Sequence, residues 1–185
     1  MDDYPEHLAP EFDEWGGVAT PFEEWRMRVR ASFPTVPEDA ARYWLHENWK
    51  HSPFSYLRSA DYSFEPQDWQ ANLIHEIRSR WCNYDPTNQD CRKHGEHVLK
   101  NIPYRTATYM RQYGFPPARL IVLDNRDGHL VAGEGGIPSY EDAPAEYILI
   151  EGHRRFNMAL AHQAQGLLKH LPIWLMKRTW DAKSD

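Results

Sequence analysis

The sequence predicts a fold of the α+β or α/β class, in which a helical N-terminal region packs on a small mixed sheet. Apolar residues recur at helical spacing in the first half, whereas the second half carries three short apolar runs typical of buried strands. The chain has 185 residues, of which 41% are hydrophobic and 14% aromatic. That content suits a packed core in a chain of about one domain.

The first half is interpreted as an irregular arm followed by helices. Residues 1–19 are acidic, contain Pro and Gly and show no period, which predicts an irregular or mobile arm. Thr20-Pro21-Phe22-Glu23 offers a cap, a proline at the first helical position and a capping-box glutamate. A helix is therefore expected to about residue 32. Pro37 can open a second helix over 38–51.

A third helix is predicted from Pro66 to about Trp81. Its evidence is an amphipathic stripe at helical spacing, assigned to the core: Trp69, Leu73, Ile74, Ile77 and Trp81. Residues 20–100 are therefore expected to form the helical region.

Residues 101–185 are expected to form a separate unit. Pro103 can start a helix that Gly114 ends. Strands are predicted at 120–123, 147–150 and 171–176, with a helix at 153–165. The connection between the first two strands is a long loop with a weak strand candidate at 129–131. Within it, Gly133-Glu134-Gly135-Gly136 is either a surface loop or a lid over a ligand.

Charge and composition narrow the class of partner. The net charge is −6, and residues 1–100 alone carry 11 Lys/Arg against 18 Asp/Glu. This acidic balance argues against a nucleic-acid binder. No apolar run reaches the roughly 18 residues of a membrane span, and the N-terminus does not resemble a secretory signal. Two cysteines make no disulfide framework, so a reducing, cytoplasmic location is expected.

One cluster of potential metal ligands stands out: Cys82, Cys91, His94 and His97. Zinc takes four such donors in a tetrahedron, and one helix can present the last three side chains. The spacing C-x8-C-x2-H-x2-H matches no common zinc finger, which argues against zinc. The alternative is a pair of buried free thiols with two exposed histidines.

The segment Glu151-Gly152-His153-Arg154-Arg155 lies between a predicted strand and a predicted helix. Gly152 permits a sharp turn, and the N-terminus of the helix offers unpaired N–H groups with partial positive charge. Two Arg residues in the first turn of a helix oppose the helix dipole, and each lowers the stability of the helix by a few tenths to ~1 kcal/mol. A bound polyanion such as a nucleotide's phosphates would relieve this conflict. An internal salt bridge of the Arg pair, to Glu151 or to acidic residues of the first half, is the alternative.

The run from Tyr147 to Ala159, with Glu151-Gly152-His153-Arg154-Arg155 at its centre, resembles the phosphate-binding motif of the ParB/sulfiredoxin superfamily. That motif reads Gly-Glu-Arg-Arg-x-x-Ala in partition proteins, Gly-Cys-His-Arg in sulfiredoxins and Asp-Gly-His-x-Arg in ParB-like free-serine kinases. The preceding helix and strand and the closing strand follow in the family's order. The resemblance covers residues 101–178.

The chain also departs from the family. His153 stands at the sulfiredoxin cysteine, which excludes a sulfinic-acid reductase. Only about seven residues follow the last strand, so the DNA-reading module of the partition proteins is not expected. The family's early Asn-Pro-x-x-x-Arg segment is only loosely matched by Asn101-Ile102-Pro103-Tyr104-Arg105, and Arg105 is carried over as a candidate.

The resemblance implies roles for six residues. Gly152 gives close approach to the phosphates, and Arg154 and Arg155, with Arg105, neutralise them. His153 bonds a phosphate oxygen or transfers a proton. Glu151 holds Mg²⁺ or orients a hydroxyl, as positioning and charge dominate phosphoryl transfer; its alternative role is an ion pair with Arg155.

Three functions remain open at this point. The leading one is a Mg²⁺-dependent NTP hydrolase or small-molecule phosphotransferase that uses ATP, ADP or CTP. The second is a non-catalytic nucleotide-sensing module whose helical half docks a protein partner. The third, against which the acidic first half argues, is a ParB-like nucleic-acid binder or nuclease.

Overall fold

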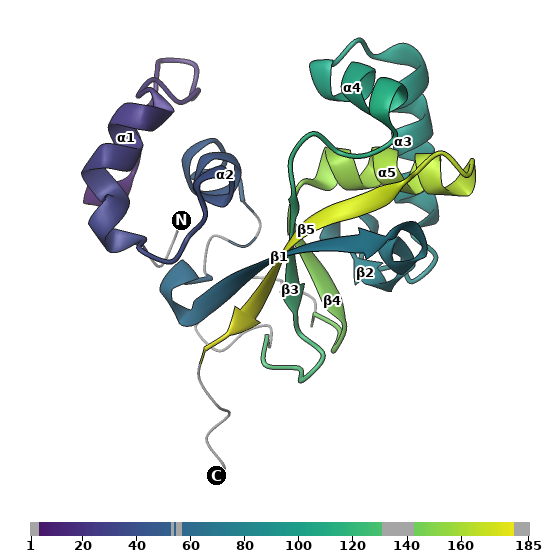
Figure 1. Ribbon diagram of the computed structural model, residues 1–185. Helices are drawn as coiled ribbons and strands as arrows, with labels where there is room; N and C mark the ends of the chain where they lie inside the picture. The colour runs from purple at the N-terminus through teal and green to yellow at the C-terminus, as the bar shows by residue number, and fades with distance from the viewer. Residues whose placement is uncertain (1–3, 53, 55–56, 131–142, 180–185) are drawn as a thin grey trace. The chain divides into compact units, whose positions relative to one another are not determined.

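A computed structural model describes residues 4–52, 54, 57–130 and 143–179 (Figure 1). The described residues divide into two compact units, residues 4–64 with 178–179 and residues 65–177. Helices and a mixed five-stranded sheet together confirm the α+β class. No helix within these ranges is long and apolar enough to cross a membrane.

The first unit is helical, as predicted. Helix α1 (Phe22–Val29) continues into a 3-10 turn, and α2 (Glu38–Ala40) continues as a π-helical segment, Ala41–His46. Trp25 is fully buried at the centre, and its indole Nε1 donates to the Leu8 carbonyl at 2.8 Å. The acidic arm is irregular, as expected, but this bond attaches it to the helices.

The second unit is built on the sheet, whose strand order is β1-β5-β3-β4-β2. Strand β3 pairs parallel to β5 and antiparallel to β4, and β2 pairs parallel to β4. The strand bounds are β1 (Tyr62–Gln70), β2 (Ile77–Arg78), β3 (Leu120–Asp124), β4 (Tyr147–Glu151) and β5 (His170–Arg178). The central strands are apolar on both faces, and the three strands predicted in the second half are confirmed.

Three helices are grouped beside the sheet: α3 (Gln89–Asn101), α4 (Arg105–Tyr113) and α5 (His153–Ala164) (Figure 1). Helix α5 is buried along most of its length and crosses α3 where Gly95 lies against the Asn157 backbone. The absence of a side chain at Gly95 therefore permits the close approach of the two helices.

The predicted helix from Pro66 to Trp81 is wrong. Residues 62–70 form β1, which neighbours β5, and a 3-10 segment, Ala71–Glu76, leads into β2. Ile74 and Ile77 are fully buried, as the stripe indicated, but strand pairing determines the backbone there. Residues 65–101 consequently belong with the sheet, and the boundary between the units falls after Phe64. The predicted helical region of residues 20–100 is thus helical in its first part and again from Gln89, where α3 begins, but β1 and β2 lie between these parts.

The long loop between β3 and β4 is closed by a buried amide. Asn125 Oδ1 accepts from the Leu130 N–H at 2.7 Å, and its Nδ2 donates to the Pro144 carbonyl at 2.9 Å. His129 and Leu130 are not in a strand, contrary to the weak strand candidate. Val131 and the candidate lid, Gly133-Glu134-Gly135-Gly136, lie outside the described residues.

Asn125→Ala is expected to lower the free energy of unfolding by about 2 kcal/mol. The substitution leaves a backbone donor and a backbone acceptor without this fully buried amide partner. Urea unfolding measures the effect. Asn101→Ala, at an exposed amide on α3, is the control and is expected to change stability by less than about 0.5 kcal/mol. Equal effects of the two substitutions would contradict the role of Asn125.

Candidate phosphate-binding site at the start of α5

The turn from β4 into α5 requires glycine. Gly152 caps α5 at a φ of +100°, in the left-handed region that side chains disfavour. A Cβ there would lie 2.5 Å from Leu120 Cδ2 and 3.3 Å from an Arg155 guanidinium nitrogen. The sharp turn expected from the sequence is therefore present, and the Arg155 guanidinium lies directly against it.

The two arginines that follow have different environments. Arg155 is buried, and its guanidinium lies 3.7 Å from Glu151 Oε1 across the turn. The structure thus forms the ion pair that was the alternative role of Glu151. Arg154 is exposed, so its cationic group is the one accessible to a ligand.

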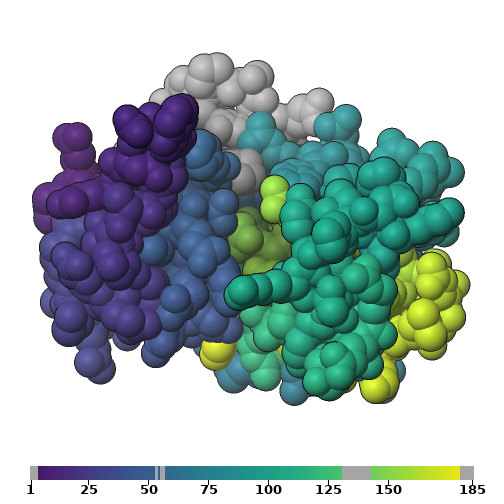
Figure 2. Space-filling model, turned by 90° about the horizontal axis from the view of Figure 1, so that it is seen from above, coloured from purple at the N-terminus to yellow at the C-terminus, as the bar shows by residue number. Residues whose placement is uncertain are grey.

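Arg154 shares a surface with the start of α4. Its guanidinium carbon lies 5.5 Å from the centroid of the Tyr104 ring, which is 42% exposed. Arg105, also exposed, follows directly as the first residue of α4. Figure 2 shows the teal residues of α4 spread over one face of the surface. Two of the predicted phosphate ligands, Arg154 and Arg105, therefore come from helix starts that meet at Tyr104.

His153 is enclosed. Its side chain is only 5% exposed, and neither ring nitrogen has a hydrogen-bond partner among the described residues. The exposed Trp81 presents its ring at 4.7 Å in an edge-to-face arrangement. Burial, reinforced by the charges of Arg155 and Arg80, lowers the pKa of His153 to about 3. The imidazole is therefore neutral at pH 7 and is covered in this conformation.

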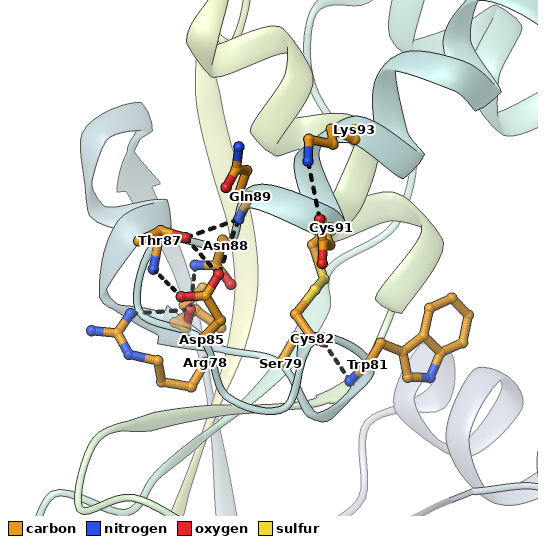
Figure 3. The surroundings of a disulfide bond; sticks show 12 residues. Arg78, Ser79, Trp81, Cys82, Asp85, Thr87, Asn88, Gln89, Cys91 and Lys93 are labelled. Atoms are coloured by element: carbon orange, nitrogen blue, oxygen red, sulfur yellow. Dashed lines mark hydrogen bonds and ion pairs between the residues drawn. A yellow bond between two sulfur atoms is a disulfide. The ribbon is translucent and has the colours of Figure 1, made fainter.

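The four candidate zinc ligands do not converge on one point. Cys82 and Cys91 form a disulfide (Figure 3), so the expectation of free thiols is wrong. His94 faces the Trp81 ring, and His97 Nδ1 is 3.1 Å from Asn101 Nδ2. Across the described ranges, no three His, Cys, Asp or Glu side chains are grouped so that they could hold a metal ion.

Sequence reasoning missed the aromatic residues of this site and the arginine beside them. Trp81 was assigned to the core of a helix, yet 53% of it is exposed and its ring packs 4.7 Å from the His153 ring, in a T-shaped arrangement. No sequence pattern indicated Arg80 or Tyr104, because they are brought close to α5 only by the tertiary fold. No family model matches the chain, and neither curated proteins nor solved structures give a significant match.

Proposed function

We propose that the protein binds the phosphate groups of a nucleotide at the start of α5. The observation that carries this proposal is the exposed Arg154, held over Tyr104 beside Arg105 at the N-terminal end of a helix. Cationic side chains at this end oppose the helix dipole, and an anion would relieve the conflict while accepting bonds from backbone N–H groups. The likeness of the segment to the ParB/sulfiredoxin motif points to the same ligand class.

The same geometry bears on catalysis. To hold Mg²⁺, as an NTP hydrolase or phosphotransferase would require, Glu151 would have to share its carboxylate between the metal ion and Arg155. To transfer a proton, His153 must first become accessible. A nucleotide-sensing module requires neither change, and the Glu151–Arg155 pair favours it as the second candidate function. An assay of nucleotide turnover in the presence of Mg²⁺ distinguishes the two functions, because only the hydrolase or phosphotransferase would consume the nucleotide.

Nucleotide binding is expected to raise the unfolding temperature. The test adds ATP, ADP, CTP, GTP or pyrophosphate, each with and without Mg²⁺. A ligand present at 100 times its Kd adds about 2.7 kcal/mol to the free energy of unfolding. The double variant Arg105→Ala/Arg154→Ala is expected to lose the shift, because both exposed cations are removed.

Arg92→Ala is the matched control, since Arg92 is an exposed arginine of α3. It is expected to retain the full shift. If no phosphate compound raises the unfolding temperature of the wild type, the proposed function is wrong. A shift that survives in the double variant would place the ligand elsewhere.

A further inference from the structure

The disulfide closes a short loop with an unusual backbone. Cys82 ends a 3-10 turn, and Cys91 lies in the first turns of α3, where it is 2% exposed. In the described part of the chain, the three non-glycine residues with positive φ all lie between these cysteines: Asn83 at 49°, Tyr84 at 56° and Asn88 at 50°. Left-handed backbone is disfavoured for a residue such as Tyr84, so this loop conformation depends on its constraints.

Trp81 connects this loop to the candidate site. It precedes Cys82 directly, and its side chain extends away from the disulfide (Figure 3). The Trp81 ring lies 4.7 Å from the ring of His153 and 6.5 Å from that of His94. A covalent bond one residue away thus limits where this half-exposed ring can move.

His153 is a buried polar group that packs against the Trp81 ring but makes no side-chain hydrogen bond within the described residues. Both ring nitrogens are buried without a partner in the described structure, which is a costly arrangement in a folded protein. The next residue is Arg154, the exposed cation of the proposed phosphate site. If Trp81 moved aside, the imidazole would be placed to donate to the same anion.

We propose that the Cys82–Cys91 disulfide is a redox gate on the phosphate site: the oxidised form holds Trp81 over His153, and reduction uncovers it. This inference rests on the proposed function. A dithiol reductant opens the bond, so that each cysteine gains a hydrogen and the two reductant sulfurs form a disulfide. Opening frees the turn that carries Arg80 and Trp81. His153 then becomes a further donor to the bound phosphate.

The charges around His153 determine how the change can be followed. Arg155 faces it from α5 and Arg80 from the turn before Cys82, while Glu151 of β4 pairs with Arg155 and His94 of α3 faces Trp81. Opening the turn removes part of the burial and moves the Arg80 charge away. The pKa of His153 should therefore rise from about 3 toward the ordinary value near 6.5.

The test uses the full chain, oxidised or treated with dithiothreitol. NMR titration of the His153 ring is expected to show protonation near pH 6 only after reduction. Calorimetry with pyrophosphate at pH 6 is expected to show binding about tenfold tighter in the reduced form, the effect of one hydrogen bond to a charged group. The Cys82→Ser variant should behave as the reduced form whether or not dithiothreitol is added.

A second variant keeps the test valid if Cys82→Ser misfolds. Trp81→Ala leaves the disulfide intact and should uncover His153 in the oxidised protein, whereas Trp15→Ala, at a ring 87% exposed, should change nothing. A His153 titration that is unchanged by reduction overturns the gate, even if pyrophosphate binds. A shifted titration without pyrophosphate binding overturns the proposed function but supports the coupling of the disulfide to His153.

Discussion

Gly95→Ala is expected to lower the free energy of unfolding by about 3 kcal/mol, and the melting temperature by roughly 10 °C. Replacing glycine by alanine inside a helix ordinarily stabilises it by up to about 1 kcal/mol. Here the added Cβ would overlap the backbone carbonyl of Asn157, where α3 crosses α5. A backbone atom cannot rotate away, so the two helices must separate, and the overlap outweighs the gain in propensity.

Lys100→Ala is the control for this substitution, because it changes an exposed position of the same helix. It is expected to leave the melting temperature within about 2 °C of the wild type. Stabilisation by Gly95→Ala would show that the helices approach less closely than in this structure. Since α5 begins at the candidate site, the variant is also expected to weaken pyrophosphate binding.

His153 is expected to make the oxidised protein acid-sensitive. Its pKa is about 3 in the folded state, against about 6.5 when unfolded, so between these values the unfolded chain binds more protons. The stability that the protein gains from keeping His153 neutral is therefore fully present above pH 6.5. This part of the free energy of unfolding is lost as the pH falls toward 3. At pH 4.5 the loss amounts to about 2–3 kcal/mol. Urea unfolding from pH 8 to pH 4.5 measures it.

His153→Leu is expected to remove most of this dependence, because a leucine cannot take up the proton. At pH 8 the variant should be at least as stable as the wild type, since an apolar side chain of similar size replaces two buried nitrogens without partners. Some dependence should remain from His162, whose pKa burial also lowers. His51→Leu removes an exposed histidine as the control. A pH dependence unchanged in His153→Leu would refute this account.

The sequence predicted the elements whose signals are local. Strand β4 and helix α5 were found because an apolar run, a glycine and a helical pattern follow one another within a few residues. Strands β1 and β2 were missed because Trp69, Ile74 and Ile77 repeat at a spacing that also suits a helix. Their pairing with β5 and β4 depends on residues roughly 70 or more positions away, which no local pattern contains.

The candidate site was predicted only in part, because the sequence pattern does not contain the tertiary contacts that complete it. The motif indicated Arg154 and Arg155 as equal partners for an anion, whereas burial directs Arg155 toward Glu151 and leaves Arg154 exposed. The roles of Trp81 and of the Cys82–Cys91 bond arise only when the turn before α3 is brought against α5. Phosphate binding and the ParB/sulfiredoxin likeness stay predictions that the experiments above address.

The ion pair between Glu65 and Lys177, 2.7 Å from Oε2 to Nζ, joins the two ends of the described part of the sheet-containing unit. These residues lie on β1 and β5, which are neighbours in the sheet. In chain order, residues 65–177 are thus a continuous segment whose two ends meet. Segments of this kind can be excised, circularly permuted or transplanted with short linkers. Because residues 65–177 contain both Trp81 and Arg154, this segment offers a minimal unit for studying the candidate site apart from the helical residues that precede it.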